Sequence, residues 1–411
     1  MPPAYPYEGR TPHHLDSIAG WSPYLKRGTR YVLTQSFPDR WRLWLRLSMT
    51  DHIGPVILKQ LHHHKVNLEA LIQRPKRGYE FGLSERQCGA LGTVPPDWLA
   101  AVARTELWLQ QGHMRFVMTL DDGDYPSNLL EMTDPPALLY GTGHRALLHD
   151  RAGLGIVGTR NPTAQGLKDA HRFSAHLAQQ GMVIVSGMAL GIDAAAHEGA
   201  LSVAPQTGPN TIAIVGTGLD IVYPKANTSL MARIQQEGLV LSEFALGTGP
   251  QRMHFPKRNR LIAGWSIGTL VIEAATASGS LITAQMAADM GREVFAVPGS
   301  IHATQSKGCH ALIKQGAKLV ESAQDIIDEL PQHVVRTTRI SAGPAANETQ
   351  PIGLKTAEQA LLDQMGLAPT TLENLVVVTG MAVPTLQTLL FDLELAGHVV
   401  RMPGGQFQHV R

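Results

Sequence analysis

The sequence has little cysteine and no long apolar run. Cys88 and Cys309 are its only cysteines, far apart and without metal-ligand spacing, so they indicate neither a metal site nor an oxidising compartment. No apolar stretch approaches the ~20 residues that cross a bilayer. The first residues also lack the charged-then-apolar order of a signal peptide. We therefore expect a globular, cytoplasmic protein without a membrane partner.

Net charge is equally scarce. Thirty-five Lys and Arg stand against 34 Asp and Glu, which gives +1. Binding of nucleic acid therefore has to rest on local positive charge rather than on the charge of the whole chain. The sequence also lacks a GxxxxGK[ST] phosphate loop, so an ATPase would be without its nucleotide site.

The first third of the chain predicts a leader and a small helical domain. Residues 1–40 are rich in Pro, Tyr, Gly and His without periodicity, which indicates a disordered leader. Residues 41–111 read as a small all-α domain of the SAM or helix-hairpin-helix type. Its turn, Ile53-Gly54-Pro55, places proline where a helix begins.

Residues 112–330 alternate apolar strands with amphipathic helices. Strands that are apolar throughout are typical of a parallel sheet covered on both faces. The pattern predicts a doubly wound, Rossmann-like α/β domain. The expected strands are at 115–120, 154–158, 182–187, 211–216, 239–244, 269–274, 293–297 and 317–320.

The last part predicts a linker and a winged helix. Residues 331–355 are rich in Pro, Ala and Thr, as in linkers. Residues 356–411 read as three short helices followed by two strands. From 355 onward there are three basic residues and five acids, and the third helix has no basic residue. Because duplex binding depends on phosphate neutralisation, we expect a protein-contact or regulatory role here.

Glycine-rich loops follow the first two central strands. One contains Gly158, Thr159 and Arg160, and the other contains Ser186 and Gly187. At the carboxyl ends of parallel strands, such loops and the helices after them favour anions. The arginine adds a forked contact to phosphate. For any single loop, a simple tight turn explains the glycines equally well.

The segment 251–260, QRMHFPKRNR, concentrates positive charge around one aromatic residue. Arg252, Lys257 and Arg258 surround Phe255, and cations for a backbone plus a ring for a base are what single-strand binding requires. Two alternatives stay open. Arg258 or Arg260 would instead anchor the fold, by capping carbonyls or pairing with Glu273, and Phe255 would instead fill the core.

A fourth loop, Ser278-Gly279-Ser280, opens a helix after the strand at 269–274. Serine at a helix start is often only an N-cap. Beside the other anion-compatible loops, it predicts a further wall of the same site.

Eight motifs follow one another in the sequence: GIVGTRNPTAQG, VSGMALGIDAAAH, GTGLDIVYP, SEFALG, HFPKRNRLIAG, EAATASGSLITAQMA, VFAVPGS and KGCHALIKQGAKLV. In this order, and from about 125 to 330, the chain resembles the DNA-processing protein A (DprA/Smf) family. The second motif usually carries Arg where this chain has Leu190, so one positive charge is missing.

The resemblance implies a non-enzymatic homodimer that coats incoming single-stranded DNA. It further implies loading of the recombinase RecA, against the single-strand binding protein, during natural transformation. Neither a catalytic residue nor a metal or cofactor is expected. The expected DNA-binding residues are Gly158, Thr159, Arg160, Ser186, Gly187, Arg252, Phe255, Lys257, Arg258, Ser278, Gly279 and Ser280.

A second hypothesis is a nucleotide-processing enzyme of the phosphoribohydrolase type. Such enzymes carry PGGxGTxxE, and the nearest match, 266–273, ends at Glu273 but lacks Pro-Gly-Gly. Two other matches are in the wrong context. The GxGxxG at 153–158 flanks a strand instead of following one, and the GxSxG at 264–268 leaves a helix. His62, His63 and His64 point different ways around a helix, which favours a solvated face over a metal site.

Overall fold

The computed structural model describes residues 40–149, 152–203 and 209–330, together with 361–362, 365, 370–381, 383–395, 398–402 and 406–409. Contacts divide the chain into two compact units between residues 343 and 344. The predicted leader, apart from Arg40, and the predicted linker at 331–355 lie outside the described residues.

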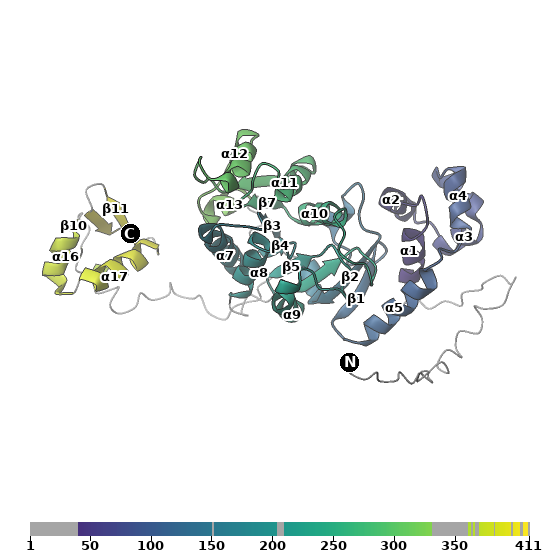
Figure 1. The fold of residues 1–411 in the computed structure, drawn as a ribbon, viewed down its shortest axis with the longest axis horizontal. Coiled ribbons are helices and arrows are strands. Elements are labelled where there is room, and N and C mark those ends of the chain that lie inside the picture. Colours follow the sequence, from purple (N-terminus) through teal and green to yellow (C-terminus); the bar gives the residue numbers. More distant parts are fainter. Residues whose placement is uncertain are drawn as a thin grey trace, which may run out of the picture. The chain divides into compact units, whose positions relative to one another are not determined.

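The first unit begins with the predicted helices (Figure 1). Pro55 starts α2 directly after Gly54, where its missing N–H costs nothing. Ser84 caps α4 with a complete capping box. Trp44, Leu61 and Leu91 are buried in the core of this region. The elements are α1 (Arg40–Ser48), α2 (Pro55–His63), α3 (Leu68–Gln73), the 3-10 helix η3 (Pro75–Phe81), α4 (Glu85–Leu91) and α5 (Trp98–Gln110).

A nine-stranded sheet follows, in the order β1-β2-β6-β5-β4-β3-β7-β8-β9. All neighbours from β6 to β9 are parallel, whereas β2 is antiparallel to both β1 and β6. The predicted doubly wound α/β domain is confirmed, with a mixed and mostly parallel sheet. The strands are β1 (Arg115–Thr119), β2 (Leu138–Gly143), β3 (Gly153–Val157), β4 (Val183–Ser186), β5 (Thr211–Ile214), β6 (Leu239–Ser242), β7 (Gly268–Val271), β8 (Glu293–Ala296) and β9 (Lys318–Leu319).

Strand β2 decides the direction of β1. Because β2 runs antiparallel to β1 and to β6, β1 has the same direction as β6. The carboxyl ends of β1 and of β3 to β9 therefore meet at one edge of the sheet, which we call the carboxyl edge.

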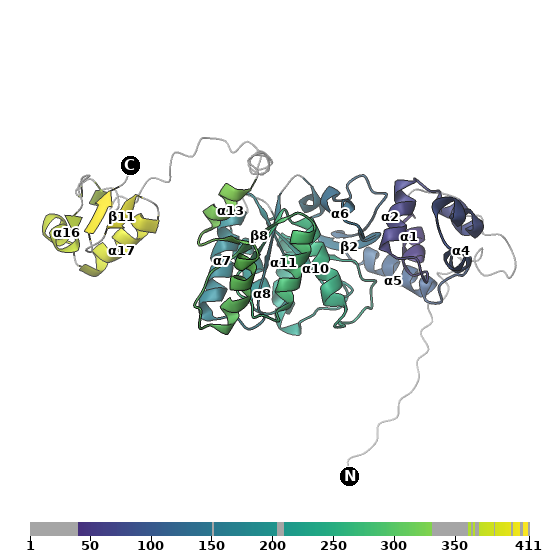
Figure 2. The same ribbon diagram turned by 90° about the horizontal axis from the view of Figure 1, so that it is seen from above.

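Helices cover both faces of the sheet (Figures 1 and 2). Side chains alternate between faces along a strand. Leu154, Ile156 and Leu270 accordingly pack with α7, α8 and α13, whereas Val157, Val185 and Val271 belong to the core under α10, α11 and α12. The helices are α6 (Ser127–Leu130), α7 (Ala164–Gln179), α8 (Ile192–Leu201), α9 (Thr228–Glu237), α10 (His254–Trp265), α11 (Gly279–Asp289), α12 (Lys307–Lys314) and α13 (Ala323–Glu329), with 3-10 helices η4 (Arg145–Leu148), η6 (Lys225–Asn227) and η7 (Thr304–Ser306).

The second unit is the predicted winged helix. Its three-stranded sheet has the order β10-β12-β11, and Leu375, Leu386 and Leu393 are buried in its core. No helix in the described parts of the chain is long and apolar enough to cross a membrane. The elements are β10 (Thr370–Thr371), α16 (Leu372–Thr379), α17 (Val383–Leu395), β11 (Val399–Met402) and β12 (Gln406–His409).

Candidate nucleic-acid interface

β3 is the strand on either side of which the chain adds its later strands. The chain adds β4, β5 and β6 on one side of β3 and then returns to place β7 on the other side. The loops after β3 and β7 therefore leave in different directions, the place where open α/β sheets bind ligands. The backbone N–H of Thr159 donates to the carbonyl of Glu273 at 2.7 Å and joins the two loops. We call the loops after β3, β4, β5, β6 and β7 the rim.

The start of α7 is occupied by a carboxylate of the chain itself. Glu273 accepts hydrogen bonds from the backbone N–H of Thr163 at 2.9 Å and from its hydroxyl at 2.6 Å. A Cβ on Gly166 would lie 2.5 Å from that carboxyl group. This negative charge fills the position that the helix dipole would offer to a phosphate. Gly158 serves packing instead, since its Cβ would lie 2.6 Å from Ile192.

Three of the predicted DNA-binding residues are buried beneath the surface of the rim. Ser186 is fully buried and donates its hydroxyl to the carbonyl of Ile156 at 2.7 Å. Arg258 is 4% exposed and donates to the carbonyl of Ile214 at 2.8 Å. Gly187 makes room for it, because a Cβ there would lie 1.6 Å from the guanidinium. Together these residues tie the ends of β3, β4 and β5 to one another.

The geometry of Arg258 and Arg260 thus agrees with the fold-anchoring alternative. Arg260 donates to the carbonyl of Asp134 at 2.6 Å and pairs with Glu243, so its partner is not Glu273. Burial raises the pKa of Glu243, while the nearby Arg260 opposes that rise. Burial also lowers the pKa of Arg258 to about 10.

A buried polar cluster that the sequence reasoning missed surrounds Arg258. Asp193 accepts from the backbone N–H of Ala189 at 3.3 Å, and burial raises the pKa of its carboxyl group although Arg258 is near. His197 is fully buried and shares a hydrogen bond with the hydroxyl of Thr211 at 2.7 Å. Burial and the charge of Arg258 lower the pKa of His197 to about 3, so this imidazole is neutral.

Three predicted cations remain at the surface of the rim. Arg160, Arg252 and Lys257 are exposed, and none forms an ion pair with a residue that the structure describes. Phe255 lies among them in the first turn of α10 and is outside both core clusters of this unit. Its ring lies 5.2 Å from the guanidinium of Arg160.

Tyr223, after β5, extends this aromatic surface and was not singled out from the sequence. Its ring lies 5.8 Å from that of Phe255 with the planes tilted by 40°, and the residue is 39% exposed. The motif GTGLDIVYP contained it, but only the fold brings its loop beside α10. Two adjacent rings with a guanidinium on one of them offer a stacking surface for bases.

The loop after β7 contributes less surface than predicted. Ser278 accepts from the backbone N–H of Ser280 at 3.3 Å and therefore caps α11. Its hydroxyl lies 2.6 Å from that of Ser280, which is buried. Gly279 is exposed, and a Cβ there would meet open space. Of the three residues predicted here, Gly279 and the half-buried Ser278 reach the surface.

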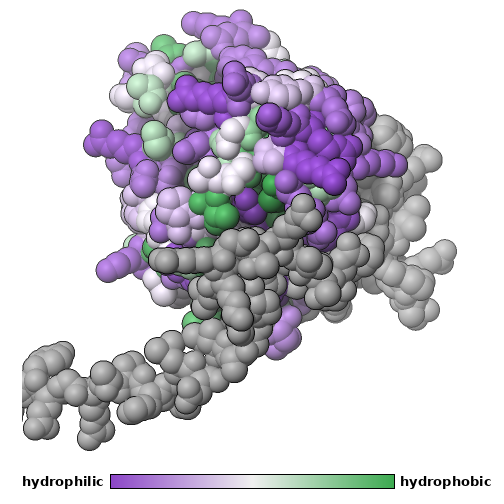
Figure 3. All heavy atoms as spheres, turned by 90° about the vertical axis from the view of Figure 1, so that its right-hand side faces the viewer, coloured by the Kyte–Doolittle hydropathy of each residue, from purple (hydrophilic) through white to green (hydrophobic). Residues whose placement is uncertain are grey.

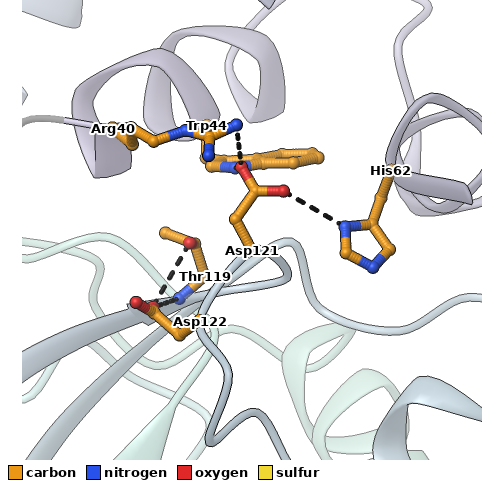
Figure 4. A network of polar contacts seen from close by, with 6 residues as sticks. All are labelled: Arg40, Trp44, His62, Thr119, Asp121 and Asp122. Carbon is orange, nitrogen blue, oxygen red and sulfur yellow. Dashed lines mark hydrogen bonds and ion pairs between the residues drawn. The ribbon is translucent and has the colours of Figure 1, made fainter. Parts of the chain in front are cut away.

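The helical region docks on the carboxyl edge through Asp121, which follows β1 (Figure 4). Its carboxylate accepts from the indole of Trp44 at 2.7 Å and lies 2.8 Å from the guanidinium of Arg40. The imidazole of His62, on α2, lies 3.2 Å from it. At the next position, Asp122 instead caps Thr119 of its own turn. Asp121 thus fixes α1 and α2 at the edge that carries the rim.

Comparison with known proteins identifies the chain. Residues 116–331 match the family model of DNA recombination-mediator protein A, and residues 344–405 match that of the DprA winged helix domain. The chain belongs to the DprA/Smf family.

Several DprA/Smf proteins are similar over most of their length. Protein Smf of Synechocystis sp. is 35% identical over 399 residues, 89% of this chain and 98% of that protein. The X-ray structure of DprA from Streptococcus pneumoniae has a TM-score of 0.59 at 37% identity and covers 72% of this chain and 99% of that one. A Helicobacter pylori DprA structure, described for its single-stranded DNA binding mode, has a TM-score of 0.47 at 33% identity over 52% of this chain and 94% of that one.

Membership in the DprA/Smf family removes the phosphoribohydrolase hypothesis, because this is a family of recombination mediators and not of enzymes. The role of Glu273 agrees with that conclusion, since its carboxylate is held by Thr163 at a helix start. Within the described ranges, no group of three His, Cys, Asp or Glu side chains is arranged to hold a metal ion.

Proposed function

We propose that this chain binds single-stranded DNA along the rim. Arg160, Arg252 and Lys257 would take phosphates, and the rings of Phe255 and Tyr223 would take a base. The observation that carries the proposal is the arrangement of three exposed cations, without an ion pair among the described residues, around an aromatic pair, with Arg160 lying over Phe255 at 5.2 Å. Stacking on aromatic rings within a basic groove is how strands are held without regard to sequence.

The exposed parts of the glycine-rich loops border the same surface. Apart from Gly158, which packs against Ile192, the remaining predicted contacts that are not fully buried are Thr159, Ser278 and Gly279. Their backbone groups would position a strand without reading its bases. We therefore expect little base preference.

The recombination-mediator family supports the wider role. We propose that the chain acts as a homodimer in the cytoplasm, coats incoming strands during natural transformation, and loads RecA on them against the single-strand binding protein. Recombination mediation requires a recombinase partner, and the matched family model supplies this premise.

The test is a salt titration with labelled poly-dT and a blunt duplex of equal length. We expect the single strand to bind far more tightly, and equal affinities would contradict the proposal. Arg160→Ala should cost about 1–3 kcal/mol of binding free energy and flatten the salt dependence by roughly 0.7, the value for one phosphate on a single strand. Lys168→Ala, an exposed cation on α7, is the matched control and should leave both values unchanged.

A further inference from the structure

A second concentration of positive charge lies on the helical region. Between residues 59 and 77 there are five Lys and Arg and a single acid, Glu69. Lys65, Arg74, Lys76 and Arg77 are all exposed, and we call these four residues the helical basic patch. Figure 3 shows the side of the molecule that carries the helical region, and hydrophilic residues make up most of its coloured surface, around a smaller apolar area.

The patch has few partners of its own. Within the part of the chain that the structure describes, only Arg77 among the four forms an ion pair, with the exposed Glu80 at 3.3 Å. Such an exposed pair contributes little and exchanges readily with another anion. Lys65, Arg74 and Lys76 form no ion pair with any described residue.

A hollow of about 160 Å³ lies beside two residues of the patch. Lys65 and Arg77 line it, together with the amide side chain of Asn67 and the ring of Phe81. The ring of His64 lies 6.0 Å from that of Phe81. Cations beside an aromatic ring are the same combination of groups that the rim presents, and they suit a phosphate next to a base.

The fold holds α2, the helix that precedes the patch, at the carboxyl edge. His62 of α2 contacts Asp121, which follows β1, and Lys65 comes just after the end of α2. Lys59, also on α2, donates to the carbonyl of Met132 at 2.6 Å. β1 and β3 are separated by five strand spacings in the sheet order, roughly 24 Å at the usual interval. A single strand of moderate length spans that interval.

We propose that the helical basic patch is a second phosphate-binding subsite, which holds the backbone of the same DNA strand that runs over the rim. This inference rests on the proposed function of the rim. It predicts that strand length decides whether the patch contributes: a short strand occupies the rim alone, and a longer one reaches both.

The test compares oligo-dT of about 6 nucleotides, which is within the size of about 4–16 nucleotides known for one single-strand site, with oligo-dT of about 20 nucleotides, which exceeds it. Lys65→Ala/Arg77→Ala should weaken binding of the long strand about tenfold and flatten its salt dependence by roughly 1.4, the value for two phosphates. Binding of the short strand should not change. Lys168→Ala/Arg172→Ala, two exposed cations on α7, is the matched control. Arg74→Ala/Lys76→Ala repeats the test if the first variant does not fold.

Unchanged long-strand binding in a folded patch variant overturns the proposal, as does an equal loss in the control. An equal loss for both strand lengths also overturns it, because the patch would then not be a separate subsite. The rim proposal fails in a different measurement: Arg160→Ala would then bind the short strand as tightly as the wild type does. The two proposals therefore fail in different measurements.

Discussion

Neighbouring arginines of this chain have opposite environments. Arg252 is exposed, three residues before Phe255. Arg258, six residues further along the chain, is 4% exposed and donates to a backbone carbonyl. Both looked alike in the sequence QRMHFPKRNR. The difference arises because α10 begins at His254: Arg252 precedes the helix, whereas Arg258 lies within it and reaches the carbonyl of Ile214 at the end of β5. Exposure therefore decides which cations of this segment are available to an anion.

A Phe255 that stacks on a DNA base and a Phe255 that packs in the protein core would respond differently to substitution. Because it lies outside the core clusters, Phe255→Ala should lower DNA affinity by about 1–3 kcal/mol at any salt concentration while thermal stability barely changes. Binding isotherms at two salt concentrations and a melting curve measure both effects. Phe173→Ala, on the buried side of α7, is the control and should cost roughly 3–5 kcal/mol of stability. A similar stability loss at Phe255, with normal affinity in the folded fraction, would remove it from the site.

At the scale of elements, the sequence predicts long periodic patterns better than short irregular ones. The expected strands correspond to β1 and to β3 through β9, because each is a run of apolar residues. β2 was missed, since Leu138–Gly143 contains two glycines and follows two prolines, which are poor strand signals. At the rim, residue types indicated an anion site. They did not reveal that Glu273 fills one helix start or that Ser186 points inward, because both depend on contacts between distant segments.

The buried hydrogen bond between His197 of α8 and Thr211 of β5 predicts that the stability of the fold depends on pH. His197 of α8 has a pKa of about 3 in the folded protein, below its ordinary 6.5, so the unfolded chain binds the extra proton between these values. Its contribution is complete above pH 6.5 and is lost as the pH falls toward 3. Urea unfolding at about pH 7 and about pH 4.5 should show a smaller decrease in the free energy of unfolding for His197→Gln than for the wild type. Parallel decreases would show that other groups control acid stability.

At the scale of the whole molecule, the two units differ in their surfaces. The first unit presents the rim and the helical basic patch. In the winged helix, neither α16 nor α17 contains a basic residue, and Val377 and Val378 are 82% and 60% exposed. Exposed apolar side chains on a helix without basic residues are more typical of contact with protein than with phosphate.

Removal of residues 344–411 should therefore leave single-strand affinity nearly unchanged. The measurement is a binding isotherm for poly-dT with the truncated and full-length chains, at one salt concentration. Size-exclusion chromatography checks that both have the same oligomeric state, since loss of avidity would otherwise imitate loss of a contact. A decrease of about tenfold or more, equal to 1.4 kcal/mol, would show that the winged helix contributes directly to DNA binding.

The carboxylate of Glu273 at the start of α7 also bears on competition. A cell contains abundant free nucleotides, each of which carries phosphates that compete for any deep anion seat. Here the carboxylate of Glu273 occupies the anion site at the start of α7, and the exposed cations of the rim are spread over an open surface. A mononucleotide gains one or two of these weak contacts, whereas a polymer gains many at once. If the rim is the binding site, we therefore expect the protein to select its ligand by length, so that free nucleotides at ordinary cellular levels leave it available to DNA.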